Sequence, residues 1–119
     1  MMAVIFEVRP ADGRQDDYLG IATSLRADLS SIEGFISVER FQSLTDPNKL
    51  LSLSFWRDEK AVENWRNHAR HRESQIEGRA GIFADYRLRI AAVTRDYGKA
   101  DRAEVPDDSR AIHDRQPAP

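Results

Sequence analysis

Residues 51–97 read LSLSFWRDEKAVENWRNHARHRESQIEGRAGIFADYRLRIAAVTRDY, and this stretch decides the fold. It begins with an alternating, strand-like run and continues into a helical pattern. Asp58 is well suited to begin that helix, because its carboxylate can accept a hydrogen bond from a free backbone N–H of the first turn. Glu59 adds negative charge where the helix dipole favours it. Gly78 and Gly81 end the helical pattern, and a long final strand is predicted after them.

The predicted helix, or a pair of short helices that break near Asn67, carries two stripes of side chains. The apolar stripe consists of Val62, Trp65, Ala69 and Ile76. The polar stripe consists of Asn64, His68, His71 and Gln75. One side of this segment is therefore expected to pack on a core, while another side presents amide and imidazole groups.

The final strand is predicted over residues 82–97, and both of its sides carry apolar residues. One side holds Tyr86, Leu88, Ile90 and Ala92, and the other holds Arg87, Arg89, Ala91 and Val93. A strand of this kind is expected to be covered in part on both faces of its sheet.

The first half of the chain supplies the remaining elements. Residues 3–8 are rich in strand-forming types, residues 14–32 repeat apolar side chains at helical spacing, and residues 35–42 alternate as a strand. A turn over residues 45–48 joins this strand to the next in a hairpin. The order β-α-β-β-α-β predicts a ferredoxin-like α+β fold, in which a four-stranded antiparallel sheet carries both helices on one face.

Length and composition exclude several classes of protein. A chain of 119 residues is expected to form one domain. Its 18 basic and 20 acidic residues give a net charge of −2, which is not the basic excess typical of a nucleic-acid binder. No cysteine is present for disulfides or thiolate chemistry, and neither a signal peptide nor an apolar run of membrane-spanning length is evident. We expect a cytoplasmic protein with no membrane and no nucleic-acid partner.

The last part of the chain differs from the rest. Residues 99–119 hold three of the five prolines and no aromatic residue, a composition that buries little apolar surface. We therefore expect a domain over residues 1–98 and a mobile tail over residues 99–119. The alternative is that the tail is an arm that docks on a partner subunit through Val105 and Ile112.

Three segments resemble one known family. They are IEGFISVERFQS, LSLSFWRDEKAVENWRNHARH and FADYRLRIAAV, and the resemblance extends over residues 3–97. The family is that of the antibiotic-biosynthesis-monooxygenase domains. It implies a homodimeric α+β barrel, in which two sheets pack face to face and each subunit keeps a pocket between its sheet and its helices.

The same resemblance implies a cofactor-independent monooxygenase that acts on an aromatic or quinol-type small molecule, with no cofactor and no metal. The family's helix tryptophan corresponds to Trp65 in ENWRNH, and its helix histidine is best matched by His71. In this interpretation His71, or its competitor His68, is the base. Asn64 donates to the oxyanion and Arg87 adds positive charge. Further substrate contacts are assigned to His68, Tyr86 and Trp56.

Each of these residues also has a structural explanation. Trp65 lies in an apolar stripe, where core packing is common. A histidine on a helix is often simply solvated, and Arg87 could form an ordinary salt bridge. The rival function is a non-catalytic domain that binds a hydrophobic small molecule. Haem degradation is a further alternative, although Gln75 stands ten residues after Trp65, where those relatives carry a histidine, and the first strand has no asparagine.

Overall fold

The computed structural model describes residues 1–114, except for the side chains of residues 69, 70, 77 and 78. The elements follow in the order β1 (Met2–Pro10), α1 (Gln15–Ser24), α2 (Arg26–Ser31), β2 (Phe35–Gln42), β3 (Leu50–Trp56), α3 (Glu59–Arg66), α4 (Ala69–Glu77), the π-helical turn η1 (Gly78–Ile82), β4 (Phe83–Ala92) and α5 (Asp107–His113). Within this described part, no helix combines the length and the apolar character needed to cross a membrane.

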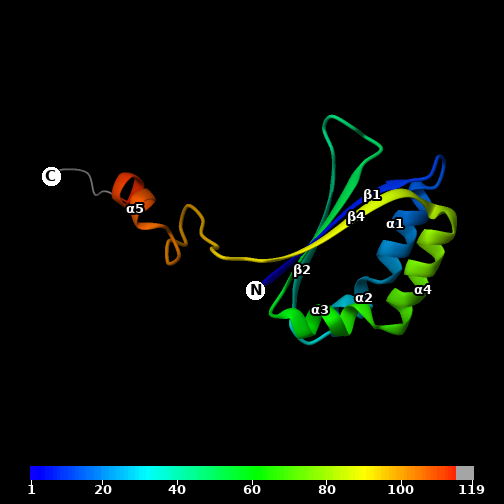
Figure 1. Ribbon diagram of the computed structural model, residues 1–119, viewed down its shortest axis with the longest axis horizontal. Helices are drawn as coiled ribbons and strands as arrows, with labels where there is room; N and C mark the ends of the chain where they lie inside the picture. Colours follow the sequence, from blue (N-terminus) through cyan, green and yellow to red (C-terminus); the bar gives the residue numbers. More distant parts are fainter. Residues whose placement is uncertain (115–119) are drawn as a thin grey trace.

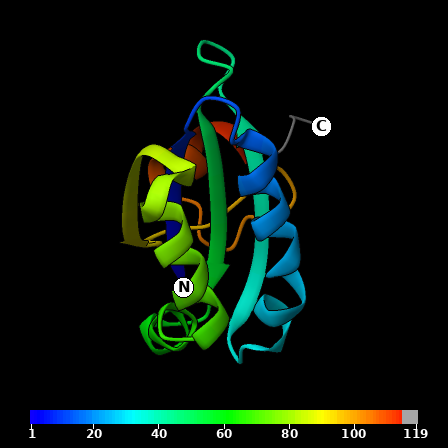
Figure 2. The same ribbon diagram turned by 90° about the vertical axis from the view of Figure 1, so that its right-hand side faces the viewer.

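The four strands form one antiparallel sheet in the order β2-β3-β1-β4. Helices α1 to α4 lie together on one side of this sheet (Figures 1 and 2). This arrangement confirms the predicted ferredoxin-like α+β fold.

Strand register places alternate residues of all four strands on the side that faces the helices. Its central rows are Val38–Ser54–Val4–Ile90 and Arg40–Ser52–Phe6–Leu88. Two apolar clusters fill the ends of this layer. One is built on Val8, Tyr18, Leu50 and Ile82, and the other on Leu29, Trp56, Ala61 and Val62. The core is therefore divided, and between the two clusters β2 and β3 contribute the polar side chains Arg40, Ser52 and Ser54.

The second cluster is organised by Trp56, whose side chain has no exposed surface. Its indole Nε1 donates to the hydroxyl of Ser54 at 2.8 Å, so burial leaves no polar atom of the ring unsatisfied. Two residues later the Asp58 carboxylate accepts from the backbone N–H of Ala61 at 2.9 Å, which confirms the predicted cap. The strand end and the beginning of α3 are thus fixed together.

Three sequence predictions need correction. The helix expected over residues 14–32 is divided into α1 and α2 at Leu25. The final strand ends at Ala92 rather than Tyr97. The N–H of Val93, just beyond the strand, donates to the carbonyl of Met1 at 3.0 Å. Ile76 does not share the apolar face, because α4 begins as a new helix after Asn67 and leaves this side chain 70% exposed.

The outer face of the sheet, opposite the helices, combines an apolar centre with charged edges. Its centre consists of Ile5, Leu51, Leu53 and Phe55. The Glu7 carboxylate on β1 forms two ion pairs there. Its oxygens lie 3.3 Å from Nζ of Lys49, just before β3, and 3.4 Å from Nη1 of Arg89 on β4. These ion pairs hold the pKa of the Glu7 carboxyl below its ordinary value, with the hydrogen bond from Lys49 as the largest cause.

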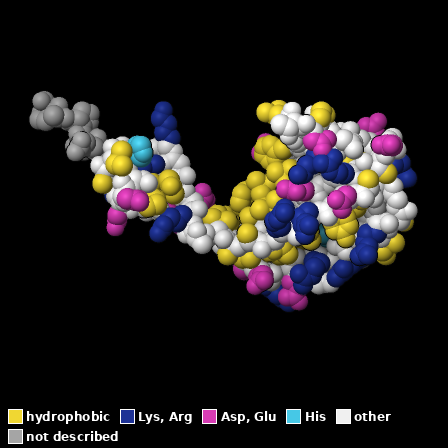
Figure 3. Space-filling model, turned by 45° about the horizontal axis from the view of Figure 1, so that its top comes forward, with side chains coloured by type: hydrophobic (Ala, Val, Ile, Leu, Met, Phe, Trp, Pro, Cys, Tyr) yellow, Lys and Arg dark blue, Asp and Glu magenta, His cyan; other side chains and the backbone are white. Residues whose placement is uncertain are grey.

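Beyond β4 the chain leaves the body as an extended segment that ends in α5 (Figure 1). Arg102 organises this arm: its guanidinium bonds Asp114 at 2.9 Å and the carbonyl of Gly98 at 3.0 Å, and it lies over the ring of Tyr97. Val105 is buried. Hydrophobic side chains gather on the side of the body next to the arm (Figure 3). Mobility of residues 99–119 stays a prediction, and residues 115–119 lie outside the described residues.

The fold makes a prediction at Gly34, which joins α2 to β2 with φ of +89°. A Cβ atom there would lie 2.8 Å from the Cβ of Ala61. We expect Gly34→Ala to lower the free energy of unfolding by about 2 kcal/mol or more, through left-handed strain and this clash together. Gly13→Ala is the control, because Gly13 has φ of +76° but no neighbouring atom within 4 Å. Denaturant unfolding that gives equal losses for both variants would contradict this steric account.

Candidate functional site

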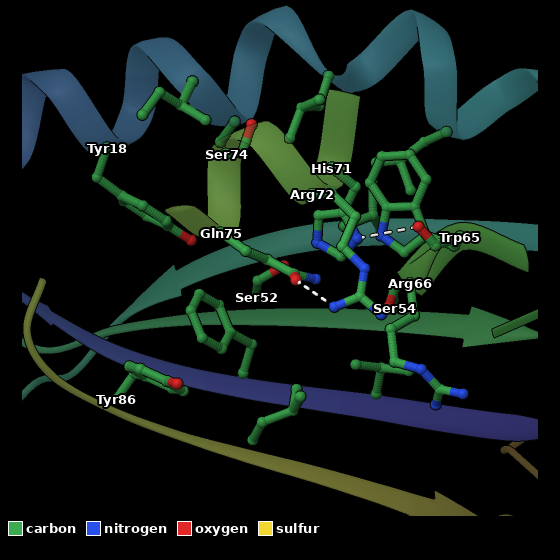
Figure 4. A pocket seen from close by; sticks show the side chains of 18 of the residues that line it. Tyr18, Ser52, Ser54, Trp65, Arg66, His71, Arg72, Ser74, Gln75 and Tyr86 are labelled. Carbon is green, nitrogen blue, oxygen red and sulfur yellow. Dashed lines mark hydrogen bonds between the residues drawn. The ribbon is translucent and has the colours of Figure 1, made fainter. Parts of the chain in front are cut away.

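A cavity of about 380 Å³ lies between the sheet and the helices, in the gap between the two core clusters. This volume falls in the range of small-molecule sites. Figure 4 shows part of its lining. The polar lining residues are Tyr18, Arg40, Ser52, Ser54, Trp65, Arg66, His71, Arg72, Ser74, Gln75, Arg79 and Tyr86, and the rest are aliphatic residues and phenylalanines from the strands and from α1 to α3.

The imidazole of His71 is held in one orientation by Trp65. The two rings stack, with centroids 4.4 Å apart and an angle of 13° between their planes. His71 Nδ1 lies 3.0 Å from the carbonyl oxygen of Trp65 (Figure 4). A carbonyl can only accept, so Nδ1 carries the proton in the neutral ring and Nε2 keeps a free lone pair. The geometry therefore prepares Nε2 to take a proton.

Burial lowers the pKa of His71 from its ordinary value, and this desolvation is the largest cause. The hydrogen bond to the Trp65 carbonyl acts in the opposite direction, whereas the charges of Arg72 and His68 lower the pKa further. A lowered pKa means that the ring is neutral at physiological pH, which is the form that a general base needs.

Next to His71, the side chain of Arg72 is fixed between two amides. Its guanidinium donates to Gln75 Oε1 at 2.9 Å and to Asn67 Oδ1 at 2.7 Å. Asn67 is the residue at which α3 ends, so this pair of bonds joins the break between the helices to the second turn of α4. Gln75, ten residues after Trp65, is thereby hydrogen-bonded to a cation.

A second polar group enters the cavity from the sheet. Arg40 of β2 and Ser52 of β3 are direct cross-strand partners on the helix-facing side. The hydroxyl of Tyr18 on α1 lies close enough to Arg40 for a hydrogen bond. Burial raises the pKa of Tyr18, and the positive charge of Arg40 opposes this rise. The phenol accordingly stays protonated at neutral pH and can donate a hydrogen bond.

The structure brings together three of the residues proposed from sequence: Trp65, His71 and Tyr86 all line the cavity. His68 does not line it, although its ring centroid lies 5.7 Å from that of Trp65. His68 Nδ1 is buried and has no hydrogen-bond partner in the described part of the chain. Of the two histidines, only His71 has a ring that borders the cavity.

Three other residues proposed from sequence do not line the cavity. Asn64 is exposed on α3, because the residues of this helix that face the cavity are Val62, Trp65 and Arg66. Arg87 alternates with Tyr86 along β4 and so points to the outer face. Trp56 is fully buried against Phe35 and Trp65, with ring centroids 5.3 and 6.3 Å away, and supports the site from the core.

Sequence reasoning missed Arg40, Tyr18 and Ser52. A signal was present for Arg40, because strand alternation places it on the same face as Val38, in line with the core. An arginine at an inward position of a predicted strand is unusual and indicates a polar site. Tyr18 falls within residues 14–32, whose apolar spacing predicted only a helix.

A metal site would require several ligating side chains among the residues that the structure describes. They contain no group of three or more His, Cys, Asp or Glu side chains arranged to hold an ion. His68 and His71 both approach Trp65, through ring contacts rather than around a common point.

Comparison with known sequences gives three findings. The profile of the family "Antibiotic biosynthesis monooxygenase" matches residues 1–75. A Pyricularia oryzae protein named "Jasmonate monooxygenase ABM" is 52% identical over 94 residues, which are 79% of this chain and 44% of that protein. The Bacillus subtilis protein YqjZ is 29% identical over 62 residues, 52% of this chain and 53% of its own. The chain thus spans about half the length of the curated relatives it matches.

Solved structures agree on the fold. A putative antibiotic biosynthesis monooxygenase from Deinococcus radiodurans has a TM-score of 0.74 at 8% identity, with 82% of this chain and 97% of that chain covered. The Rv0793 protein of Mycobacterium tuberculosis has a TM-score of 0.73 at 12% identity, covering 82% and 98%. Since the family profile covers more than half of the sequence, the chain belongs to the antibiotic biosynthesis monooxygenase family.

Proposed function

We propose that the protein is a cofactor-independent monooxygenase, which oxidises a small aromatic or quinol-type molecule in the cavity between sheet and helices. The observation that carries the proposal is the state of His71. Its ring is stacked on Trp65, its Nδ1 is occupied by a carbonyl, and its Nε2, for which the described residues provide no hydrogen-bond partner, belongs to a ring that borders the cavity. These features are the requirements for a base that deprotonates a bound substrate.

The chemistry needs few groups because the substrate supplies the electrons. Nε2 takes a proton from an activated C–H or O–H group, and the resulting anion reduces molecular oxygen. When a methylene is oxidised to a carbonyl, one oxygen atom enters the product and the other leaves as water, so no external reductant is required. The protein has to hold the aromatic ring, remove the proton and exclude bulk water.

The relatives support a monooxygenase in general terms. The 52% identical Pyricularia oryzae protein is named for the oxygenation of a small molecule, and its match includes the greater part of this chain. Trp65 and Tyr86 offer aromatic surfaces for stacking within the cavity. A non-catalytic binding protein would use the same cavity, and oxygen consumption separates the two functions.

The first functional prediction concerns His71. Oxygen uptake should be measured with a panel of quinols and anthrone-like phenols, without added metal or flavin. We expect His71→Ala to lower turnover by about 100-fold or more, because general bases typically contribute ~10²–10⁴. Asn64→Ala is the matched control, since Asn64 lies on the preceding helix but outside the cavity, and its turnover should stay within about twofold of the original. Equal rates for the His71 variant and the original protein would favour the binding function.

The second prediction concerns pH. Burial lowers the pKa of His71 below its ordinary 6.5. The turnover rate should therefore fall only below that pH, where the imidazole becomes protonated and can no longer act as a base. The unfolded chain takes up this proton before the folded one as pH falls, so the stability contributed by neutral His71 is present above pH 6.5 and decreases below it. NMR titration of the imidazole nitrogens should show the lowered pKa and a proton on Nδ1.

Variants test the cause of this shift. Arg72→Gln removes a positive charge beside the ring and should raise the pKa of His71, whereas Arg87→Gln on the outer face should leave it unchanged. A pKa of His71 above 6.5 in the original protein would contradict the desolvated base.

We also propose that the functional unit is a homodimer, formed by the outer faces of two sheets. The centre of this face is apolar on β1 and β3, while its edges carry Glu7, Arg87 and Arg89 for ion pairs. An apolar face of this kind is stabilised when a second copy removes it from water. Leu88 and Ile90 are not part of this interface, because they line the cavity on the opposite side.

Sedimentation at micromolar concentration should therefore give about twice the 13.6 kDa of one chain. We expect Leu53→Asp to yield monomers or to abolish folding, because a charge in an apolar interface loses its hydration. Ile76→Asp, on an exposed position of α4, is the control and should remain dimeric. A folded monomer for the unaltered protein at this concentration would rule out the proposed dimer.

A further inference from the structure

The lining of the cavity is asymmetric in charge. Four arginines border it, namely Arg40, Arg66, Arg72 and Arg79, and its lining includes no aspartate or glutamate among the described residues. An apolar cavity with cationic groups and no anion is suited to a ligand that brings its own negative charge.

Arg40 differs from the other three by its burial. Arg66, Arg72 and Arg79 are exposed, and Arg72 already donates to Gln75 and Asn67. In water such side chains discriminate weakly between charged and neutral ligands. Arg40 projects from the sheet into the layer between sheet and helices, where most of its surface is covered.

The guanidinium of this half-buried arginine is incompletely satisfied. Its Nε is shielded from solvent and has no hydrogen-bond partner within the described part of the chain. No carboxylate of the described residues forms an ion pair with Arg40, although ion pairs are formed by Arg9, Arg57, Arg89 and Arg102. A guanidinium without a counter-ion is unfavourable in such a position. A bound anion would remove this penalty.

Two neutral donors lie beside Arg40. Ser52 is its direct cross-strand partner, which places their Cβ atoms about 5 Å apart. Tyr18 faces Arg40 from α1 and presents a protonated hydroxyl. A planar guanidinium fork flanked by hydroxyl donors matches the two oxygens of a carboxylate.

We propose that Arg40, with Tyr18 and Ser52, forms a carboxylate-binding subsite, and that the natural ligand of the cavity is a small apolar molecule that carries a carboxylate. This inference rests on the proposed function for the identity of the cavity as the substrate site, and it adds the chemical class of the substrate. The carboxylate binds at the β2 side, and the apolar body extends along Phe6 and Leu88 toward Trp65 and His71.

The test compares two probes that share one ring system and differ in charge: 2-naphthoate and its methyl ester. Binding to the full chain is measured by titration calorimetry at fixed ionic strength. The carboxylate should bind at least about tenfold more tightly than the ester. Arg40→Met should abolish this preference by lowering the affinity for the carboxylate probe alone. Arg40→Lys should retain a part of the preference, because lysine keeps the charge without the planar fork.

Matched controls locate the effect. Arg66→Met and Arg79→Met remove exposed arginines from the same lining and should keep the preference within about threefold. Thermal unfolding of Arg40→Met should occur at the same or a higher temperature, because the variant removes an unpaired buried charge. Tyr18→Phe should reduce the preference by a smaller factor than Arg40→Met.

Three results would overturn the subsite: equal affinity for the two probes, no binding of either at millimolar concentration, or equal losses in the Arg40 and Arg66 variants. Failure of the subsite is distinguishable from failure of the proposed function. If the protein consumes oxygen with neutral quinols but shows no preference for the carboxylate probe, the subsite alone is contradicted. If the protein prefers the carboxylate probe through Arg40 but consumes no oxygen, the proposed monooxygenase activity alone is contradicted.

Discussion

The stack of aromatic rings that begins at Trp56 determines the geometry of the site. Trp56 is fully buried at the end of β3, where Ser54 satisfies its indole N–H. Trp65 packs on it from α3, and His71 packs on Trp65 from α4, at 6.3 and 4.4 Å between centroids. Because the lowest ring is held by the sheet, each ring above it is positioned relative to the sheet. The imidazole of His71, on a short helix, is thereby given a fixed orientation.

The break between α3 and α4 makes this stack possible. In one continuous helix, Trp65 and His71 would be about 600° apart and would not lie above one another. The chain leaves helical geometry at Asn67, and the Trp65 carbonyl then accepts from both the backbone N–H of His68 and the ring of His71. The carbonyl that a helix end leaves unsatisfied becomes the partner that selects the tautomer of His71. A local irregularity thus serves both helix termination and the site.

The cavity exists because the core is incomplete. Large apolar side chains form two clusters at the ends of the helix-facing layer, while the central rows of the sheet carry Ser52, Ser54 and Arg40. Small hydroxyl side chains on β3 leave room, and the arginine cannot close it without burying its charge further. His71 borders this space from the helices and Arg40 borders it from the sheet. This separation suits a ligand with one reactive end and one charged end.

Local pattern was sufficient for the secondary structure and for its order. Strand alternation, the Asp58 cap and the terminating glycines each act over a few residues, so β-α-β-β-α-β and the sheet with helices on one face could be predicted. Trp65 and His71 could also be selected, because their neighbours in the chain matched a known family. Boundaries were less certain where strand pairing decides them: β4 ends at Ala92, where its pairing with β1 ends, although Val93 and Tyr97 are residue types that are common in strands.

The sequence by itself therefore determined the fold class, the family and the two aromatic residues at the centre of the site. Only the tertiary structure decided which side chains share the cavity. Asn64 directly precedes Trp65 on the same helix, yet its side chain is exposed to solvent. Arg40, 25 residues before Trp65, points into the cavity. The physical reason is that the set of side chains that meet at the cavity depends on how the helices pack across the sheet and, for His71, on the direction that α4 takes after the break at Asn67. Both are set by packing between segments distant in the chain, and not by the residues on either side.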